Sequence, residues 1–414
     1  MKKMLKKLVA VALLVASVVS VFAFSGCFLG KEKDNLFSEN LLAVKLNDKW
    51  GYVDKAGNVK ISYKYDYAYA FSDGLAKVKK EDKYGYINAK GDVVVDFEFD
   101  SASSFSEGLA YVGLKNKKGD YVYGYINKKG EYVVETMFSD AYNFKEGLAV
   151  VAIEDKSGDT LYGYINKKGE YVVEPTLYDA YDFSEGFAAV SIKNKQGDEL
   201  YGFINKKGDY IVEPTFYDVY DFSEGFAGVA IKDKDNKILC GFIDKTGEYV
   251  IEPTFSDIYS FSEGLAVASV KDKKGDELYG YIDKTGEFVI EPIYTDAYDF
   301  NEGFAVVEVY DEKEEEYFYG VIDETGDYLV EPIYDDAGYF NCGIVCVEKD
   351  DEWIGIDKTG KKSFVGIKWD GGYGFFDDGY CVVYTYDKTD GYTYGVINTK
   401  GEEIIKCKYE NINW

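Results

Sequence analysis

The chain of 414 residues contains no histidine, no arginine and only five prolines. Without histidine it lacks the usual general base and the commonest metal ligand. Without arginine it lacks the planar group that grips phosphates and carboxylates. A formal net charge of -28 makes nucleic-acid binding unfavourable as well. Apolar residues still make up 46% of the chain, which is enough for a core and excludes a wholly disordered protein.

The first 26 residues have the pattern of an export signal. Lys2, Lys3, Lys6 and Lys7 precede an apolar run over residues 8–24, and small residues follow. The sequence Phe24-Ser25-Gly26-Cys27 resembles the lipobox of bacterial lipoproteins, although Phe24 stands where that family usually has leucine. The resemblance implies cleavage before Cys27 and attachment of diacylglycerol to its thiol. An ordinary signal peptide, or an uncleaved anchor of 17 residues that is short for a membrane span, is the alternative.

This signal predicts a location on the outer face of the cytoplasmic membrane of a bacterium. Lipid attachment at Cys27 would be the only membrane contact, with residues 27–40 acting as a tether. Removal of residues 1–26 takes away four lysines and no acid, so the mature net charge is -32. An anionic envelope should therefore repel the folded part over about 8–10 Å at ordinary salt.

Five further cysteines do not form a disulfide framework. Their number is odd, and they do not occupy the same place in successive copies of the repeat described next: Cys240, Cys342, Cys346, Cys381 and Cys407. Scattered buried thiols are the simpler interpretation. The sequence leaves their redox state open.

Residues 41–414 consist of one unit repeated about ten times. Each copy carries a glycine that mostly follows an aromatic residue, at Gly51, Gly85, Gly124, Gly163, Gly202, Gly241, Gly280, Gly320, Gly355 and Gly395. A Glu-Gly pair or its variant ends 23 residues after most of these glycines, whereas the return distance varies from 11 to 17 residues. A constant spacing predicts packed scaffold, and a variable one predicts exposed hairpin tips.

Each unit is predicted to contain three or four strands. In one middle copy we expect strands at residues 186–192, 200–205 and 210–214, joined by turns that contain Gly197 and Gly208. We expect Pro214 to end the third strand, with a short fourth strand in the return segment. Both faces of the first two strands are largely apolar, so each small sheet should be covered on both sides by its neighbours.

The repeat resembles the bacterial WG repeat family. Lys49-Trp50-Gly51-Tyr52-Val53-Asp54-Lys55-Ala56-Gly57 is the closest copy of that signature, although tyrosine replaces the tryptophan in most other copies. The resemblance implies an all-β repeat protein with no general enzymatic role. We expect an open, curved superhelix, because no strand is evident at one end to complete a sheet at the other and the end copies are the more polar ones. A closed propeller-like ring, or two five-bladed rings, is the alternative.

Three kinds of functional site can be weighed from the sequence. Repeated aromatic residues suggest sugar binding, and the best ligand-facing candidates lie in the return segments: Tyr178, Tyr181, Tyr217 and Tyr220. Acidic turns such as residues 272–277 suggest calcium, but lysines interrupt the alternation of a calcium loop. Paired carboxylates such as Asp182 and Glu185 suggest a glycosidase, but they recur with the whole motif, which favours a structural role. We therefore predict no catalytic residue, no metal site and no cofactor.

The function predicted is a non-catalytic binding or structural module at the cell envelope. The partner would be an unidentified protein or an envelope glycan, and not a nucleic acid. A cell-wall glycan or carbohydrate-binding protein that uses the repeated aromatic side chains is the alternative.

Overall fold

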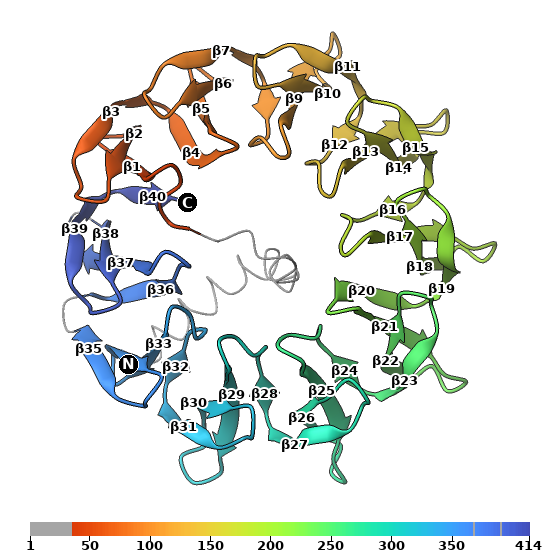
Figure 1. Ribbon diagram of the computed structural model, residues 1–414, viewed down its shortest axis with the longest axis vertical. Helices are drawn as coiled ribbons and strands as arrows, with labels where there is room; N and C mark the ends of the chain where they lie inside the picture. The colour runs from red at the N-terminus through yellow and green to blue at the C-terminus, as the bar shows by residue number, and fades with distance from the viewer. Residues whose placement is uncertain (1–34, 367–368, 390) are drawn as a thin grey trace.

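The computed structural model describes residues 35–366, 369–389 and 391–414. These residues form forty strands and no helix, so none of them makes a helix able to cross a membrane. The strands pair into ten antiparallel sheets of four strands each. The sheets stand side by side around one axis and close into a ring (Figure 1). The predicted all-β array of about ten antiparallel modules is confirmed.

We number the sheets 1 to 10 around the ring. Sheet 1 contains β1 (Leu41–Leu46), β2 (Lys49–Asp54), β3 (Val59–Tyr65) and β40 (Asn411–Asn413), and sheet 2 contains β4 (Tyr67–Ser72), β5 (Leu75–Lys80), β6 (Lys83–Asn88) and β7 (Val93–Phe99). Sheet 3 contains β8 (Ser101–Ala102), β9 (Leu109–Lys115), β10 (Tyr121–Asn127) and β11 (Tyr132–Phe138), and sheet 4 contains β12 (Asp140–Ala141), β13 (Leu148–Glu154), β14 (Thr160–Asn166) and β15 (Tyr171–Leu177). Sheet 5 contains β16 (Asp179–Ala180), β17 (Phe187–Lys193), β18 (Glu199–Asn205) and β19 (Tyr210–Phe216). Sheet 6 contains β20 (Asp218–Ser223), β21 (Phe226–Lys232), β22 (Ile238–Asp244) and β23 (Tyr249–Phe255), and sheet 7 contains β24 (Asp257–Ile258), β25 (Ala266–Lys271), β26 (Glu277–Ile282) and β27 (Phe288–Tyr294). Sheet 8 contains β28 (Asp296–Ala297), β29 (Phe304–Asp311), β30 (Glu316–Asp323) and β31 (Tyr328–Tyr334), and sheet 9 contains β32 (Asp336–Ala337), β33 (Ile344–Lys349), β34 (Glu352–Asp357) and β35 (Lys362–Gly366). Sheet 10 contains β36 (Gly371–Phe375), β37 (Tyr380–Asp387), β38 (Gly391–Asn398) and β39 (Glu403–Tyr409).

Sheet 5 shows how one repeat builds the ring. Its strands run outward in the order β16, β17, β18, β19, with β16 nearest the ring axis (Figure 1). The three strands predicted for this copy are confirmed, and the hairpin tips between first and second strands are exposed, as expected. The short strand of the return segment also exists, but it is the innermost strand of the following sheet.

Pro214 does not end the third strand, contrary to the sequence prediction. β19 continues to Phe216, because the strand makes a bulge at this point: Phe203 pairs with Val212, whereas Tyr201 pairs with Phe216. The bulge places the backbone of β19 directly over Gly202. A Cβ there would lie 2.7 Å from the nitrogen of Pro214 and 2.9 Å from the carbonyl carbon of Glu213. The repeat glycine is therefore required for close approach of the bulged strand.

The two faces of each sheet are covered by neighbouring sheets, as predicted. Between sheets 4 and 5, for example, one core contains Leu148, Tyr164, Phe183, Val190 and Ile204. The residue after the repeat glycine is the deepest part of these cores, with at most 1% of its surface exposed: Tyr52, Tyr86, Tyr125, Tyr164, Phe203, Phe242, Tyr281, Val321 and Val396. The aromatic residue before the glycine, which is part of the repeat signature, is only half-buried in most sheets.

Buried tyrosine hydroxyls also link neighbouring sheets by hydrogen bonds. Tyr164, on β14, donates to the carbonyl oxygen of Tyr181 in sheet 5 at 2.7 Å. The same bond of 2.7–2.8 Å joins other sheets through Tyr52, Tyr86, Tyr125 and Tyr281. Each bond satisfies a polar group that would otherwise be buried without a partner.

The ring is closed, so the expected open superhelix is wrong and the propeller-like alternative is correct. The C-terminal strand β40 pairs with β1 and completes sheet 1, with Ala43, Val44 and Lys45 opposite Asn413, Ile412 and Asn411. A strand was therefore left over at the C-terminus, but its three residues carry too short a pattern to be recognised in the sequence. Ile412 is 4% exposed, so this strand also completes a core.

The N-terminal side of the seam begins before Leu41. Leu36 and Phe37 are buried, and their backbone N–H groups each donate to the carboxylate of Asp378 at 3.2 Å. The last five residues of the predicted tether therefore belong to the ring. Cys27, with the rest of the predicted signal and tether up to residue 34, lies outside the described residues.

We expect Gly202→Ala to destabilise the ring by about 2–4 kcal/mol, because the added methyl group collides with the backbone of the bulge. Gly338→Ala is the matched control: a Cβ at Gly338 meets no atom nearer than 3.7 Å, and its cost should stay below about 1 kcal/mol. Urea unfolding of both variants measures the difference. Equal midpoints would show that β19 moves away at little cost.

Deletion of Asn411–Trp414 should lower the free energy of unfolding by about 2–5 kcal/mol, because it exposes the core at Ile412 and leaves one edge of β1 without its partner strand. Thermal and urea unfolding would measure this loss. As a control, the exposed hairpin at residues 155–160 can be shortened to the length found before Gly85, at a cost within about 1 kcal/mol. An unchanged midpoint after the C-terminal deletion would mean that β40 does not hold the ring closed.

Candidate functional site

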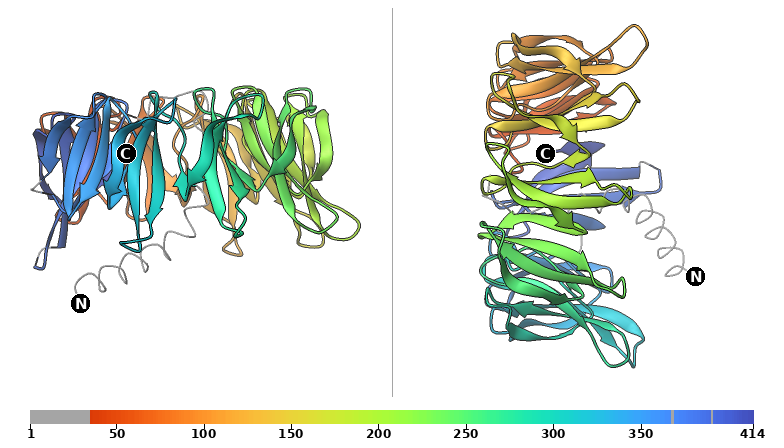
Figure 2. Two further views of the ribbon diagram at one scale, coloured as in Figure 1. Left: turned by 90° about the horizontal axis from the view of Figure 1, so that it is seen from below. Right: turned by 90° about the vertical axis from the view of Figure 1, so that its right-hand side faces the viewer.

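The ring has two rims that carry different kinds of loop. In sheet 5 one rim, here called the turn rim, carries the Glu-Gly turn at residues 184–186 and the turn at residues 206–209. The opposite rim, here called the hairpin rim, carries the variable hairpin at residues 194–198 and the link between β19 and β20. Several of the variable hairpins project from one side of the ring in Figure 2. Each rim therefore presents a distinct set of side chains.

On the turn rim, repeated glutamates bind one sheet to the next. The carboxylate of Glu185 accepts the backbone N–H of Gly225 at 2.9 Å and pairs with Lys245 at 3.1 Å, both in sheet 6. Glu107, Glu146, Glu224 and Glu302 make the same two contacts, with N···O distances of 2.8–3.0 Å to glycine and 2.9–3.2 Å to lysine. The repeated glutamate of the paired-carboxylate hypothesis thus has a structural role.

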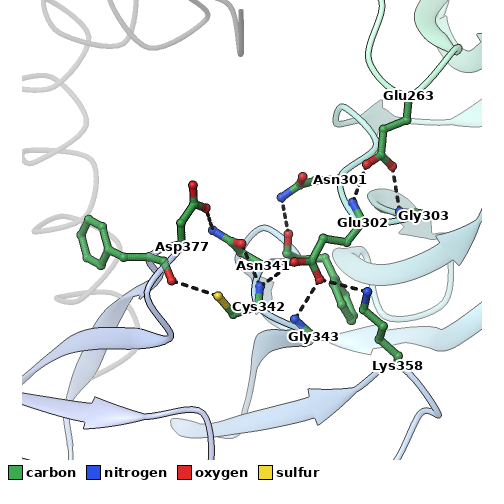
Figure 3. A network of polar contacts seen from close by, with 11 residues as sticks. Glu263, Asn301, Glu302, Gly303, Asn341, Cys342, Gly343, Lys358 and Asp377 are labelled. Carbon is green, nitrogen blue, oxygen red and sulfur yellow. Dashed lines mark hydrogen bonds and ion pairs between the residues drawn. The ribbon is translucent and has the colours of Figure 1, made fainter. Parts of the chain in front are cut away.

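Figure 3 shows this network between sheets 7 and 10, where the repeat varies. Glu302 accepts the N–H groups of Cys342 and Gly343 and pairs with Lys358. Glu263 accepts two N–H groups, from Glu302 at 2.8 Å and Gly303 at 2.7 Å. It has no lysine partner of this kind, because the matching position in sheet 8 is Glu324. Most turn-rim glutamates are thus already engaged by the fold.

The hairpin rim carries a row of aspartates on six consecutive sheets. Each is the first residue of the innermost strand in sheets 4 to 9: Asp140, Asp179, Asp218, Asp257, Asp296 and Asp336. One carboxylate oxygen accepts the N–H of the following residue at 2.8–2.9 Å. Burial raises the pKa of Asp179, Asp218, Asp257, Asp296 and Asp336. The row is thus partly removed from solvent.

Between sheets 5 and 6 the row lies beside a further carboxylate, that of Glu199. Asp179 lies opposite Ser191, which lies opposite Tyr201 on β18. The Ser191 hydroxyl donates to Glu199 at 2.7 Å. After burial, Glu199 is a further cause of the raised pKa of both Asp179 and Asp218. None of these three carboxylates forms an ion pair with a lysine of the described chain.

The four tyrosines predicted as ligand-facing lie on this rim, in sheets 5 and 6. The Nζ atoms of Lys193 and Lys232 cover Tyr178 and Tyr217, at 3.8 and 3.7 Å from the ring centroids. The ring of Tyr220 packs against Gly228. Tyr181 is 41% exposed, and its ring centroid lies 6.3 Å from that of Tyr201. Of the four, Tyr181 is therefore the one best placed to meet a ligand.

Acidic turns and free thiols account for the other candidate residues. Asp272 accepts the N–H groups of Lys274 and Asp276 at 2.7 and 3.0 Å, so its carboxylate shapes the turn. In the part of the chain that the structure describes, no three acidic or cysteine side chains are grouped as metal ligands. The five cysteines are free thiols: Cys240, Cys342, Cys346, Cys381 and Cys407. Burial raises the pKa of Cys240 to about 12, so this thiol is not a nucleophile near neutral pH.

A second set of carboxylates lies where the innermost strands end, nearer the turn rim. Burial raises the pKa of Asp182 and Asp221, and it raises the pKa of Asp299 to about 6. Oδ1 of Asp299 is buried and has no hydrogen-bond partner. Burial of this oxygen without a partner therefore lowers the free energy of unfolding.

Asp299→Asn should stabilise the ring by about 1–3 kcal/mol at pH 7–8. The folded chain binds a proton at Asp299 below about pH 6, whereas the unfolded chain binds it only below about pH 4. The contribution of this group to stability therefore falls as the pH rises from about 4 to above 6, and the amide removes that dependence. Unfolding of the variant at several pH values measures it, with the exposed Asp209→Asn as control. The same stability in both variants at pH 8 would contradict the prediction.

Comparison with known proteins supports the repeat architecture. The family described as "WG containing repeat" matches residues 35–50, 50–84, 84–118, 123–156, 162–195, 201–234, 241–273, 279–313, 319–353 and 394–413. The first and last matches are partial, and they meet where β40 pairs with β1. No match covers residues 354–393, where the repeat is most irregular. No curated protein sequence matches the chain.

Solved structures resemble the chain in fold. A crystal structure of a eukaryotic initiation factor is 11% identical, with a TM-score of 0.52 over 91% of this chain and 98% of the other. The β-propeller domain of the Trilobed protease from Pyrococcus furiosus is 9% identical, with a TM-score of 0.31 over 70% of this chain and 99% of the other. The first likeness shows the fold alone, and the second is too weak to carry an argument. By its repeats, which extend over most of its length and around its closed ring, this chain is a member of the family of proteins built from WG-containing repeats.

Proposed function

We propose that the protein is an exported, lipid-anchored binding module of the bacterial cell envelope that acts without catalysis. The export signal and the lipobox-like sequence at Cys27 support the location. The ring is a repeat β-propeller-like structure, an architecture suited to presenting a broad surface to a partner. Its partner would be a protein or an envelope component.

One observation carries the proposal for where the partner binds. The turn-rim glutamates are mostly engaged in holding neighbouring sheets together. On the hairpin rim, Asp179 and Asp218 each accept the N–H of the residue that follows, and neither forms an ion pair with a lysine of the described chain. Uncompensated charge and half-exposed aromatic rings are what a binding surface offers. We therefore assign partner binding to the hairpin rim.

Carbohydrate binding is the second candidate, favoured by the exposure of Tyr181 and Tyr217, which are 41% and 40% exposed. The lysine above Tyr217 occupies the ring face that a sugar would use. A pull-down on purified peptidoglycan and on an insoluble polysaccharide decides the question. Retention of the protein on either glycan, weakened by Tyr181→Ala, would favour the carbohydrate-binding hypothesis. No retention would exclude it.

Cys27→Ala should move the protein from the membrane fraction to the released fraction, because the variant lacks the thiol that accepts the lipid. Cys407→Ala removes a thiol of the ring and should leave the distribution unchanged. Fractionation of cells followed by immunodetection measures both. If the Cys27 variant stays with the membrane as the unaltered protein does, the anchor proposed here is wrong.

A further inference from the structure

An ammonium group is already held between two sheets of this ring. Lys77, on β5, points toward sheet 3 and places its Nζ 3.8 Å from the ring centroid of Tyr69 and 5.5 Å from that of Tyr84. The same Nζ donates to the carbonyl oxygen of Ala102 at 2.8 Å. Burial lowers its pKa to about 8. Two tyrosine rings and one carbonyl oxygen thus form a receptor for a primary ammonium group.

The repeat places the same receptor between sheets 5 and 6. Lys77 precedes Val78, which pairs with Ala68, and Ala189 precedes Val190, which pairs with Ala180. By this register Tyr181 corresponds to Tyr69, and Tyr201 corresponds to Tyr84. The carbonyl of Val219 takes the place of that of Ala102. The lysine is the element that is missing, because Ala189 stands at its position.

The surroundings of this second receptor are better suited to a cation than those of Lys77. Asp179, Asp218 and Glu199 lie beside it without an ion pair, whereas Tyr67 and Ser101 stand at the two aspartate positions around Lys77. Tyr181 is 41% exposed, so a ligand can reach its ring from the hairpin rim. Three carboxylates that form no ion pair with a lysine of the described chain lie beside two tyrosine rings whose counterparts, Tyr69 and Tyr84, hold an ammonium group. Both observations indicate the same ligand chemistry.

The other sheets fulfil these conditions less well. In sheet 6 the ring of Tyr220 lies over Gly228, which occupies the Lys77 position, and Cys240 replaces the second tyrosine. In sheet 8 Val306 occupies that position, and the ring of Tyr339 meets that of Tyr298 edge-on, with centroids 5.9 Å apart. Sheets 4 and 7 carry Val150 and Val267 there. Among the sheets that retain both tyrosines of the receptor, sheet 5 has the smallest side chain at this position, Ala189, together with Tyr181 and Tyr201.

We propose that the hairpin rim between sheets 5 and 6 binds a primary alkylammonium group, with Tyr181 and Tyr201 as the aromatic walls and Asp179, Asp218 and Glu199 as the counter-charges. A primary ammonium fits better than a quaternary one, because the Val219 carbonyl and the carboxylates need N–H donors. The group belongs to a small amine or to a lysine side chain of a partner protein. The inference rests on the proposed binding function and names the chemistry that the hairpin rim recognises.

Calorimetric titration of the full chain with n-butylammonium tests the site, with n-butyltrimethylammonium as the comparison probe. We expect saturable binding of the primary amine, at least about 5-fold tighter than that of the quaternary one and weaker at high salt. Asp218→Asn and Tyr181→Leu should each weaken binding about 5-fold or more. Asp209→Asn, which removes the same charge on the turn rim of sheet 5, should not change it.

Ala189→Lys is the most specific variant, because it restores the lysine found at position 77. The new ammonium group should fill the receptor and abolish butylammonium binding while leaving the ring folded. Absence of binding to the unaltered chain, with a dissociation constant weaker than about 10 mM, would overturn the inference, as would equal binding by the Ala189 variant. If that variant does not fold, the Asp218 and Tyr181 variants decide the outcome.

A short peptide with one lysine, and the same peptide acetylated at that lysine, separate the two sources of the ammonium group. Tighter binding of the free-lysine peptide than of butylammonium would identify a protein partner, whereas equal binding would favour a small amine. Loss of binding on acetylation is expected in both cases, and its absence would overturn the inference. An envelope component retained equally by the unaltered ring and by Ala189→Lys would sustain the proposed binding function while this inference failed.

Discussion

Each sheet of this ring is apolar on both faces, and the only cover available for a face is the next sheet. Val190 and Tyr164, on neighbouring sheets, are 0% and 1% exposed and share one core. A linear array of such sheets would expose one apolar face at each end. Closure removes both exposed faces at once, and the pairing of β40 with β1 is how this chain achieves it. The seam is therefore the interface on which all the other interfaces depend.

Much of this arrangement was predictable from the repeat. Constant spacing between the two glycines of each copy located the scaffold, and variable spacing located the exposed hairpins. The closure was not predictable, because residues 411–413 pair with β1 across more than 360 positions of sequence. The deepest aromatic residue was missed for a related reason. Tyr164 and Tyr162 flank the same glycine, and only the position of the next sheet decides which of them is buried.

The candidate site was predictable only in part. The return segments carry half-exposed tyrosines, since they lie where the chain passes from one sheet to the next, and their contact with a ligand stays a prediction. The sequence could not show that Lys193 and Lys232 cover two of them, or that Tyr181 lies beside Tyr201. It also could not separate carboxylates that hold the ring, such as Glu185, from carboxylates that lack a cation, such as Asp179. That distinction depends on contacts between sheets, which a single repeat does not contain.

Sheet 9 shows why the repeat glycine and the bulge occur together. By strand register, Trp353 holds the place of Tyr201 and Ile354 holds the place of the repeat glycine Gly202, so Gly355 falls one position later. Ile354 is tolerated because β35 lacks the wide bulge and pairs directly: Trp353 with Gly366 and Ile354 with Val365. Gly355 stands where other sheets bury a large residue, and the ring of Phe364 fills the space. Where the bulge is absent, the strand does not need a glycine at this position. The space left in the core by the shifted glycine is filled by a side chain of the neighbouring strand.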